Sequence, residues 1–277
     1  MTFLITGISS YIAQYIAQNI LDNGDSVIGI SRTKPSLRHS NFQWIKFDLS
    51  KGLPEFKFRI DYIIHMAALA RLDKSAVEYF QSNLLLTDYV RQLAQTITPK
   101  VLFYTSSIKV YGQIKDKIVD ENTPMLNPGL YGMSKSYGEK LLEEACQTIS
   151  IRMPNTIAQG SYGWIDSIYK KLKNNESIHL KNSLYNHVLH PFDIYQFIHK
   201  IIKIKYYKTN QFNICSSDPI TSFEVVQLMK KKLKSSSNLH TTDEANFHTL
   251  SNKKISNIFK PMSVIDTIIL YLKEMQG

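Results

Sequence analysis

The sequence has few cysteines, no long apolar run and no leader-like N-terminus. Cys146 and Cys215 are its only cysteines, so a disulfide framework is not expected and the spacing of a cysteine metal site is absent. No apolar run approaches the ~18 residues that span a bilayer. Residues 1–7 also lack the basic region and the apolar stretch of a signal peptide. We therefore expect a protein of a reducing, cytoplasmic compartment with no membrane partner.

Carboxylates are also scarce relative to cations. The chain has 23 acidic residues against 33 lysines and arginines, which gives a formal net charge of +10. Much of the excess lies at 170–173, 200–208 and 230–234, on or beside predicted helices, and these clusters are predicted to be solvated faces. A basic surface could also attract an anionic substrate such as a nucleotide diphosphate. Without a nucleic-acid motif or a basic stripe interleaved with aromatics, binding to DNA or RNA is not expected.

What the chain does contain is an alternation of short apolar runs and helical patterns. With 277 residues and 43% hydrophobic composition it can form one large domain with a smaller appended lobe. Strands are predicted at 2–6, 26–31, 41–47, 61–68 and 100–106, and helices at 11–23, 74–95 and 131–147. Such alternation favours an α/β fold with a doubly wound, parallel, Rossmann-type sheet. From about Gln159 the alternation loosens, with helices predicted at 161–173, 193–205, 221–234 and 263–274 and a linker-like run at 235–238.

The first strand, turn and helix predict a phosphate cradle. A helix N-terminus offers unpaired N–H groups and a partial positive charge to a pyrophosphate. The three small positions of the dinucleotide pattern are Gly7, Ser10 and Ala13. Ala13 is a mild change, whereas Ser10 places a side chain where backbone usually approaches phosphate. Its hydroxyl could donate to the phosphate instead.

The end of the second strand selects the cofactor. A carboxylate there would bind the ribose hydroxyl of NAD, whereas a cation accommodates the additional phosphate of NADP. The chain has Ser31-Arg32-Thr33 and no acid. Arginine can donate two parallel hydrogen bonds to a phosphate, although an ordinary exposed loop arginine is the alternative. The sequence favours NADP, with NAD as the second choice.

Two further positions suit a nucleotide. Asp48 stands just past the third strand, where it can accept from the adenine amino group or cap a turn. Ala67 and Ala68 follow the fourth strand, and small residues suit a wall beside a flat cofactor. His65, which precedes them, is predicted to be a buried histidine with its hydrogen bonds satisfied.

Tyr131 and Lys135 are four residues apart, so both leave the same face of a predicted helix. A phenol titrates near pH ~10 when nothing perturbs it, and a neighbouring cation favours the phenolate. The pair could therefore transfer a proton nearer neutrality, although a packed tyrosine beside a solvated lysine is the alternative. Ser107 stands at the carboxyl end of the fifth strand, where ligands gather in open α/β sheets.

Taken together, these residues resemble the extended short-chain dehydrogenase/reductase family, in its nucleotide-sugar epimerase, dehydratase and reductase branch. The resemblance covers nearly the whole chain in order. Its matching segments are Thr6-Gly7, Asp48-Leu49, His65 to Ala68, Asn83, Ser106-Ser107, Val110 to Gly112, Tyr131 to Lys135, Arg152 to Asn155, His190 to Ile194 and Phe212 to Ile214.

The resemblance implies a role for each matching residue. Tyr131 would be the general acid and base, Lys135 would lower its pKa and bind the nicotinamide ribose, and Ser107 would hold the substrate oxygen. Asn155 would also contact substrate. The cofactor would be lined by Gly7, Ser9, Ser10, Tyr11, Ile12, Ser31, Arg32, Asp48, Leu49, Ala67, Ala68, Tyr131, Lys135 and Pro154. Asn83 matches a position with a structural role.

The same resemblance implies two domains, a Rossmann domain over 1–158 and a small substrate-binding lobe over 159–277 from which part of the chain returns to the sheet. It also implies a homodimer built from the helices at 74–95 and 131–147. The arginine that grips the pyrophosphate in the family is replaced around Asn186-His187, where Lys173, Lys181 or His187 could substitute.

The two residues after Ser107 narrow the reaction. Dehydratases of the family carry an Asp-Glu pair there, whereas this chain has Ile108-Lys109, so dehydration is not expected. Arg32 favours a reductase that uses NADPH on a keto group, at C4, of a nucleotide-linked deoxysugar or another small carbonyl substrate. A nucleotide-sugar 4-epimerase with retained NAD is one alternative. A non-catalytic NADP-binding sensor or scaffold is another, suggested by Ser10 and Ala13.

Overall fold

The computed structural model describes residues 1–277 except 53, 57–58, 244–247 and 277. The described chain forms two compact units. The first, here called the sheet unit, comprises Met1–Gln113, Pro124–Arg152 and Ile194–Phe212. The second, here called the lobe unit, comprises Ile114–Thr123, Met153–Asp193 and Asn213–Gly277.

The sheet unit is built on a seven-stranded sheet with the order β12-β7-β5-β4-β1-β2-β3. Its strands are β1 (Thr2–Thr6), β2 (Ser26–Ser31), β3 (Phe42–Lys46), β4 (Tyr62–His65), β5 (Val101–Ser107), β7 (Thr148–Met153) and β12 (Asn210–Asn213). The pairings of β3 with β2, β2 with β1, β1 with β4 and β4 with β5 are all parallel. The order reverses between β1 and β4, as in a doubly wound Rossmann sheet. The predicted fold class is confirmed.

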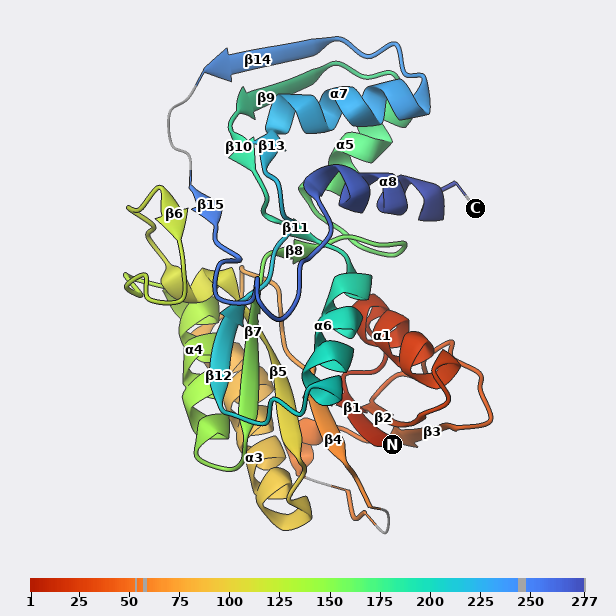
Figure 1. Ribbon diagram of the computed structural model, residues 1–277, viewed down its shortest axis with the longest axis vertical. Coiled ribbons are helices and arrows are strands. Elements are labelled where there is room, and N and C mark those ends of the chain that lie inside the picture. Colours follow the sequence, from red (N-terminus) through yellow and green to blue (C-terminus); the bar gives the residue numbers. More distant parts are fainter. Residues whose placement is uncertain (53, 57–58, 244–247, 277) are drawn as a thin grey trace. The chain divides into compact units, whose positions relative to one another are not determined.

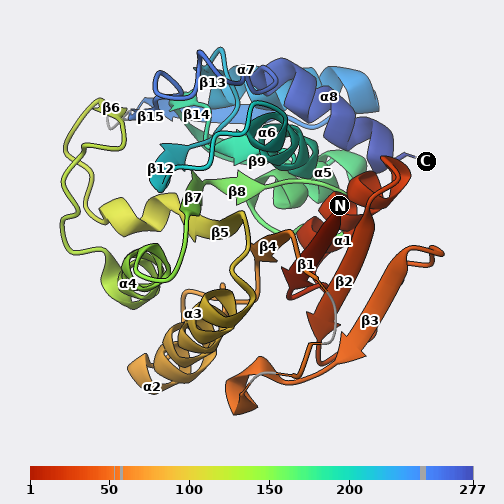
Figure 2. The same ribbon diagram turned by 60° about the horizontal axis from the view of Figure 1, so that its bottom comes forward.

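Helices cover both faces of this sheet. They are α1 (Tyr11–Asp22), α2 (Ala76–Tyr79), α3 (Leu86–Ile97), α4 (Gly129–Glu143) and α6 (Pro191–Lys203). Figure 2 shows α3 and α4 on one face and α1 and α6 on the other. Because both faces are covered, the central strands are buried, and β4 and β5 are buried at every residue.

Two helices differ from their predicted extents. The helix predicted at 74–95 is interrupted by a π-helical segment, η2 (Phe80–Leu85), between α2 and α3. The helix predicted to run to residue 147 ends at Glu143. At its end the carbonyl of Leu142 accepts from the N–H groups of Ala145 and Cys146 at 3.1 and 3.4 Å and from the Thr148 hydroxyl at 2.9 Å. Short 3-10 turns follow β3 and β5, namely η1 (Leu49–Lys51) and η3 (Ile108–Tyr111).

The lobe unit packs three helices against short two-stranded ladders (Figure 1). Its helices are α5 (Trp164–Lys173), α7 (Ser222–Leu233) and α8 (Val264–Glu274). Its ladders pair β9 (Ile178–Asn182) with β14 (Leu239–Asp243), β8 (Asn155–Thr156) with β11 (Val188–Leu189), β10 (Leu184–Tyr185) with β13 (Ile220–Thr221), and β6 (Ile118–Val119) with β15 (Thr249–Leu250). Of these, the pairing of β10 with β13 is antiparallel. One apolar cluster from α5, α7, α8 and β9 forms the core of the unit.

The run at 235–238 is not the linker that its composition predicted. Ser237 is fully buried, and the Ser235 hydroxyl and the Ser236 N–H both donate to the side-chain carbonyl of Asn175. The run therefore joins the C-terminal end of α7 to that of α5. Among the described helices, none combines the length and the apolar character needed to cross a membrane.

Candidate active site

The turn after β1 contacts the turn after β4. Gly7 has a φ of 72°, and a Cβ placed on it would stand 2.8 Å from the Cα and the N of Ala67. Only glycine allows this approach and this backbone conformation together. The two turns meet where the strand order reverses, which is where nucleotides bind in folds of this kind.

The N-terminus of α1 opens beside this turn. Ser10 is the N-cap, and its Oγ accepts from the Ala13 N–H at 3.3 Å. The hydroxyl proton is not consumed by that bond, so the donation to a phosphate predicted for Ser10 stays available. Ser9 is exposed, Tyr11 and Ile12 are half-buried, and the first turn carries no acid. These residues fit the pyrophosphate of a dinucleotide.

Two predicted cofactor-binding residues, Ser31 and Arg32, lie at the end of β2. Ser31 is buried, and its hydroxyl donates to the carbonyl of Thr33 at 2.6 Å and accepts from the Trp44 indole N–H at 3.1 Å. Arg32 is exposed. The hydroxyl of Ser31 is therefore committed to the turn, and the guanidinium of Arg32 is the group able to meet an added phosphate.

Asp48 serves as the cap of η1. Its carboxylate accepts from the N–H of Ser50 at 3.1 Å and from the Ser50 hydroxyl at 2.8 Å. The pKa of Asp48 is lowered, chiefly by the hydrogen bond from the Ser50 side chain, with a smaller contribution from the charge of Arg32. Leu49 is buried in the core of the sheet unit. Only the backbone of Leu49 can therefore reach a cofactor.

The segment that contains Ala67 and Ala68 is hydrogen-bonded to Thr6 at the end of β1. The Thr6 hydroxyl accepts from the N–H groups of Met66 and Ala67 at 3.1 and 3.2 Å. Thr6 also meets Nδ1 of His65 at 2.8 Å, while Nε2 of His65 meets the hydroxyl of Thr87 at 3.0 Å. Burial lowers the pKa of His65 to about 3, with a further contribution from the charge of Lys135. The prediction of a buried, satisfied histidine is confirmed.

Asn83 connects the segment after the Ala67-Ala68 wall to α4. From η2, its side chain accepts from the Leu69 N–H at 2.7 Å and donates to the Ser134 hydroxyl at 2.9 Å. Ser134 precedes Lys135 on α4. The structural role predicted for Asn83 agrees with these contacts, and its side chain is buried within the π-helical segment.

Lys135 is almost entirely buried, at 3% exposure. Its ammonium donates to the carbonyl of Thr105 on β5 at 2.8 Å and stands 4.8 Å from the ring centroid of Tyr104. Burial lowers the pKa of Lys135 to about 7. The alternative of a solvated surface lysine is therefore wrong. Tyr131, one turn earlier, is half-buried, with its ring centroid 6.1 Å from that of Tyr79.

Ser107 ends β5 and begins η3. It is 8% exposed, and its Oγ accepts from the Lys109 N–H at 3.2 Å. Its proton remains available to a substrate oxygen. The turn η3 packs directly on α4: a Cβ on Gly132 would overlap the carbonyl oxygen of Lys109 and stand 2.8 Å from its carbonyl carbon. The turn that begins at Ser107 and the helix that carries Tyr131 are thus in contact.

A buried ion pair was not foreseen from the sequence. Glu139 and Arg152 are 3% and 5% exposed and lie 2.7 Å apart. The sequence signal that could have indicated Glu139 is its position one turn after Lys135, on the same face of the predicted helix. Pro154 and Asn155, predicted near nicotinamide and substrate, belong to the lobe unit, where Pro154 is buried and Asn155 is exposed on β8.

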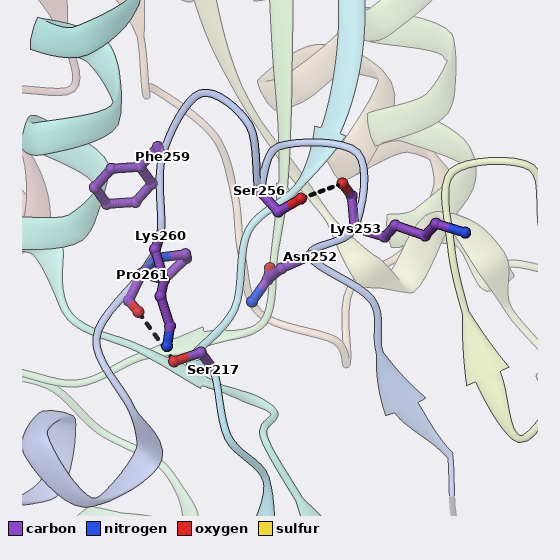
Figure 3. A pocket seen from close by; sticks show the side chains of 7 residues that line it. All are labelled: Ser217, Asn252, Lys253, Ser256, Phe259, Lys260 and Pro261. Atoms are coloured by element: carbon purple, nitrogen blue, oxygen red, sulfur yellow. Dashed lines mark hydrogen bonds between the residues drawn. The ribbon is translucent and has the colours of Figure 1, made fainter.

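The lobe unit has a small cavity of about 260 Å³. Figure 3 shows Lys253, Lys260 and Phe259 around it, together with Ser217, Asn252, Ser256 and Pro261. None of the site residues predicted from the sequence lines it. Within the described part of the chain, no group of three or more His, Cys, Asp or Glu side chains is arranged to hold a metal ion.

Comparison with known proteins identifies a family. The model of the NAD dependent epimerase/dehydratase family matches residues 3–215. Among curated relatives, the chain is 28% identical over 189 residues to a dTDP-D-glucose 4,6-dehydratase of Dictyostelium discoideum, covering 58% of this chain and 44% of that protein. It is 22% identical over 185 residues to the CDP-abequose synthase of Salmonella muenchen, covering 63% and 60%. The matches thus span about half the length of these relatives.

Solved structures share the fold. The Bordetella bronchiseptica enzyme WbmG in complex with NAD superposes with a TM-score of 0.85 at 19% identity, covering 100% of this chain and 94% of that one. The UDP-glucuronic acid 4-epimerase from Bacillus cereus in complex with NAD gives 0.82 at 17% identity, covering 100% and 99%. MoeE5 in complex with UDP-glucose and NAD gives 0.81 at 16% identity, with the same coverage.

Proposed function

Because the chain belongs to the NAD dependent epimerase/dehydratase family, we propose that it is an oxidoreductase acting on a nucleotide-linked sugar. The observation that carries the proposal is the buried Lys135 on the helix of Tyr131, packed against the turn that begins at Ser107. Three polar groups held this way match the needs of carbonyl reduction: a proton donor, a cation and a donor to the carbonyl oxygen.

Each residue has one task. The bound nicotinamide would supply the hydride. Tyr131 gives its phenolic proton to the oxygen of the reduced carbonyl and takes it back in the reverse direction. Lys135 favours the phenolate that remains, because a neighbouring cation stabilises an anion in a buried site. Ser107 donates to the same oxygen and stabilises the charge that develops on it.

We further propose that the reaction is the reduction of a keto group, at C4, of a nucleotide-linked deoxysugar by NADPH. Ile108 and Lys109 follow Ser107, so neither of these two positions supplies a carboxyl group for the proton transfers of water elimination. Arg32 is exposed at the end of β2 and no acid stands beside it in sequence. A cation there supports NADPH, the cofactor that a reductase exchanges at each turnover.

A second candidate is a nucleotide-sugar 4-epimerase with retained NAD. It is favoured by the solved structures that share the fold, since WbmG, the Bacillus cereus epimerase and MoeE5 are all complexes with NAD. An epimerase needs the same Tyr131, Lys135 and Ser107, because it oxidises and then re-reduces one carbon.

Absorbance at the reduced-nicotinamide band separates these candidates. The protein is given NADPH or NADH with a 4-keto sugar nucleotide, and separately a 4-hydroxy sugar nucleotide with no added cofactor. Net consumption of NADPH supports the reductase. Interconversion of the hydroxy sugar without net consumption supports the epimerase. A thermal shift with NADPH but no turnover on either substrate would support the non-catalytic sensor or scaffold.

The cofactor preference rests on Arg32. The Arg32→Ala protein is expected to bind NADPH about tenfold or more weakly, because a hydrogen bond to a charged group contributes about 1.5–3 kcal/mol. Its affinity for NADH is expected to stay within about twofold, because NADH lacks the added phosphate. Dissociation constants from nucleotide fluorescence check both values, and Arg38→Ala, at an exposed arginine six residues further along the chain, is the matched control. Equal loss for the two nucleotides would show that Arg32 does not select between them.

We also propose a homodimer through α2, η2 and α4. Five large apolar side chains are exposed on these segments: Val77, Phe80, Leu130, Met133 and Tyr137. The last three recur at the three- and four-residue spacing of one helix face, and a patch of this kind marks an interaction surface. Met133→Glu is expected to convert a dimer to a monomer in light scattering after gel filtration, whereas Ile265→Glu, at an exposed position on α8, is expected to leave the dimer intact. A parent chain that is already monomeric would end this proposal.

A further inference from the structure

The buried pair of Glu139 and Arg152 does more than fill the core of the sheet unit. The Arg152 guanidinium donates from Nη2 to Oε2 of Glu139 at 2.7 Å and from Nε to Oε1 at 3.0 Å. Such a bidentate contact fixes both position and orientation. Burying two charges costs several kcal/mol for each ion, so a pair of this kind adds little net stability. Because stability alone does not explain the pair, we expect a role connected with α4, the helix that carries Glu139, Tyr131 and Lys135.

The Glu139 carboxylate is also the anchor of the strand that ends at Ser107. The Ser106 hydroxyl donates to Oε1 of Glu139 at 2.5 Å. Arg152, which pairs with this carboxylate, also donates from Nη1 to the Tyr111 hydroxyl at 3.2 Å. Its guanidinium carbon stands 5.2 Å from the centroid of the Tyr111 ring. One carboxylate on α4 therefore holds both ends of the segment from Ser106 to Tyr111, directly at the first and through Arg152 at the second.

Lys135 lies one turn before Glu139 on the same helix, among few charged neighbours. The titratable groups around it are Tyr104 on β5, whose ring lies under the ammonium, His65 on β4, and Tyr131 and Glu139 on α4 itself. Burial lowers the pKa of Lys135, and the charge of Glu139 acts in the opposite direction. His65 is neutral near pH 7, because burial lowers its pKa to about 3. Glu139 is thus the neighbouring anion that favours the charged ammonium.

We propose that Glu139 is a positioning residue for the catalytic groups, fixing the strand end at Ser107 against α4 through Ser106 and keeping the Lys135 ammonium charged. Arg152 has the matching role of orienting that carboxylate, because its guanidinium donates to both carboxylate oxygens. The proposal rests on the proposed function for the roles of Ser107 and Lys135. Its two parts, the tether and the charge, can be removed separately.

Three variants separate the tether from the charge. Ser106→Ala removes the tether and keeps every charge. Glu139→Gln keeps an oxygen that can accept from Ser106 but removes the charge. Glu139→Gln with Arg152→Met removes both charges and leaves no buried cation unpaired. It is therefore the variant to measure if Glu139→Gln alone does not fold. The ionisation of Lys135 is followed by NMR of isotope-labelled lysine in the cofactor-free protein, with Lys135→Arg to assign the signal, and kcat is measured alongside.

The expected results differ for each variant. Ser106→Ala should leave the pKa of Lys135 unchanged and lower kcat about tenfold, because small misplacements of catalytic groups are costly. Glu139→Gln should lower the pKa of Lys135 by about one unit, because a nearby opposite charge is lost. The basic limb of the pH–kcat profile should move to lower pH by the same amount. The double variant should return the pKa towards the parent value, because an anion and a cation leave together.

The NMR titration does not depend on turnover, so it separates this proposal from the proposed function. If Lys135 titrates at the same pH in the parent and in folded Glu139→Gln, the charge role is wrong. If folded Ser106→Ala also keeps the parent kcat, the tether role is wrong and the pair is only part of the core. A parent protein without activity on any sugar nucleotide, but with the expected titrations, would overturn the proposed function and leave the charge role of Glu139 standing.

Discussion

Replacing Tyr131 with phenylalanine is expected to lower kcat by roughly 10²–10⁴-fold, the range that a positioned general acid contributes. The change deletes one hydroxyl and keeps the ring that packs near Tyr79. Affinity for the dinucleotide is expected to change little, because the turn after β1, the N-terminus of α1 and Arg32 are untouched. Steady-state turnover of the sugar nucleotide that the parent accepts, together with a binding titration, measures the two effects separately.

Tyr137 supplies the control for this prediction. It is on the same helix as Tyr131, six residues later, and 59% exposed, so Tyr137→Phe is expected to turn over as the parent does. Thermal unfolding should give both variants nearly the Tm of the parent. If Tyr131→Phe is folded, binds dinucleotide and works at the parent rate, the phenol is not the proton donor and the proposed chemistry fails.

The doubly wound class of the sheet could be predicted because its cause is local in the sequence. Short apolar runs bounded by turn residues alternate with helical periodicity, and right-handed crossovers leave few ways to arrange such units. The exact ends of helices and turns could not be predicted in this way, because they involve contacts between segments that are distant in the sequence. The helix expected to reach residue 147 ends at Glu143, where the Thr148 hydroxyl donates to the Leu142 carbonyl, and the run at 235–238 donates to the side chain of Asn175. In both places a side chain from another segment contacts the end of the element.

The candidate site divides in the same way. Tyr131, Lys135 and Ser107 could be singled out because their chemistry and spacing are visible in the sequence. The burial of Lys135 could not, since nothing in a Y-x-x-x-K pattern shows that the ammonium turns towards Thr105 on β5. The pairing of Glu139 with Arg152 joins residues 13 positions apart on a helix and a strand. It becomes evident only when α4 and β7 are side by side.

Gly132 shows how a residue with no reactive group can control the site. In an ordinary helix interior, replacing glycine by alanine stabilises a protein by about 0.5–1 kcal/mol. At Gly132 the sign is expected to reverse, because the new Cβ would overlap the Lys109 carbonyl oxygen and stand 2.9 Å from Cβ of Pro128. Overpacking of this kind costs about 1–3 kcal/mol, which corresponds to a fall in Tm of several degrees for a chain of this size.

Activity should fall further than stability in the Gly132→Ala protein. Because the clash is with backbone, we expect it to be relieved by moving η3 away from α4. This would separate Ser107 from Tyr131, and a displacement of about 1 Å can cost roughly 100-fold in rate. The comparison is Met133→Ala, one residue along and 55% exposed, measured for Tm and kcat in parallel at a protein concentration where both samples share one oligomeric state. A Gly132→Ala protein as stable and as active as the parent would mean that the turn and the helix need not touch, and the shared site of Ser107 and Tyr131 would have to be abandoned with it.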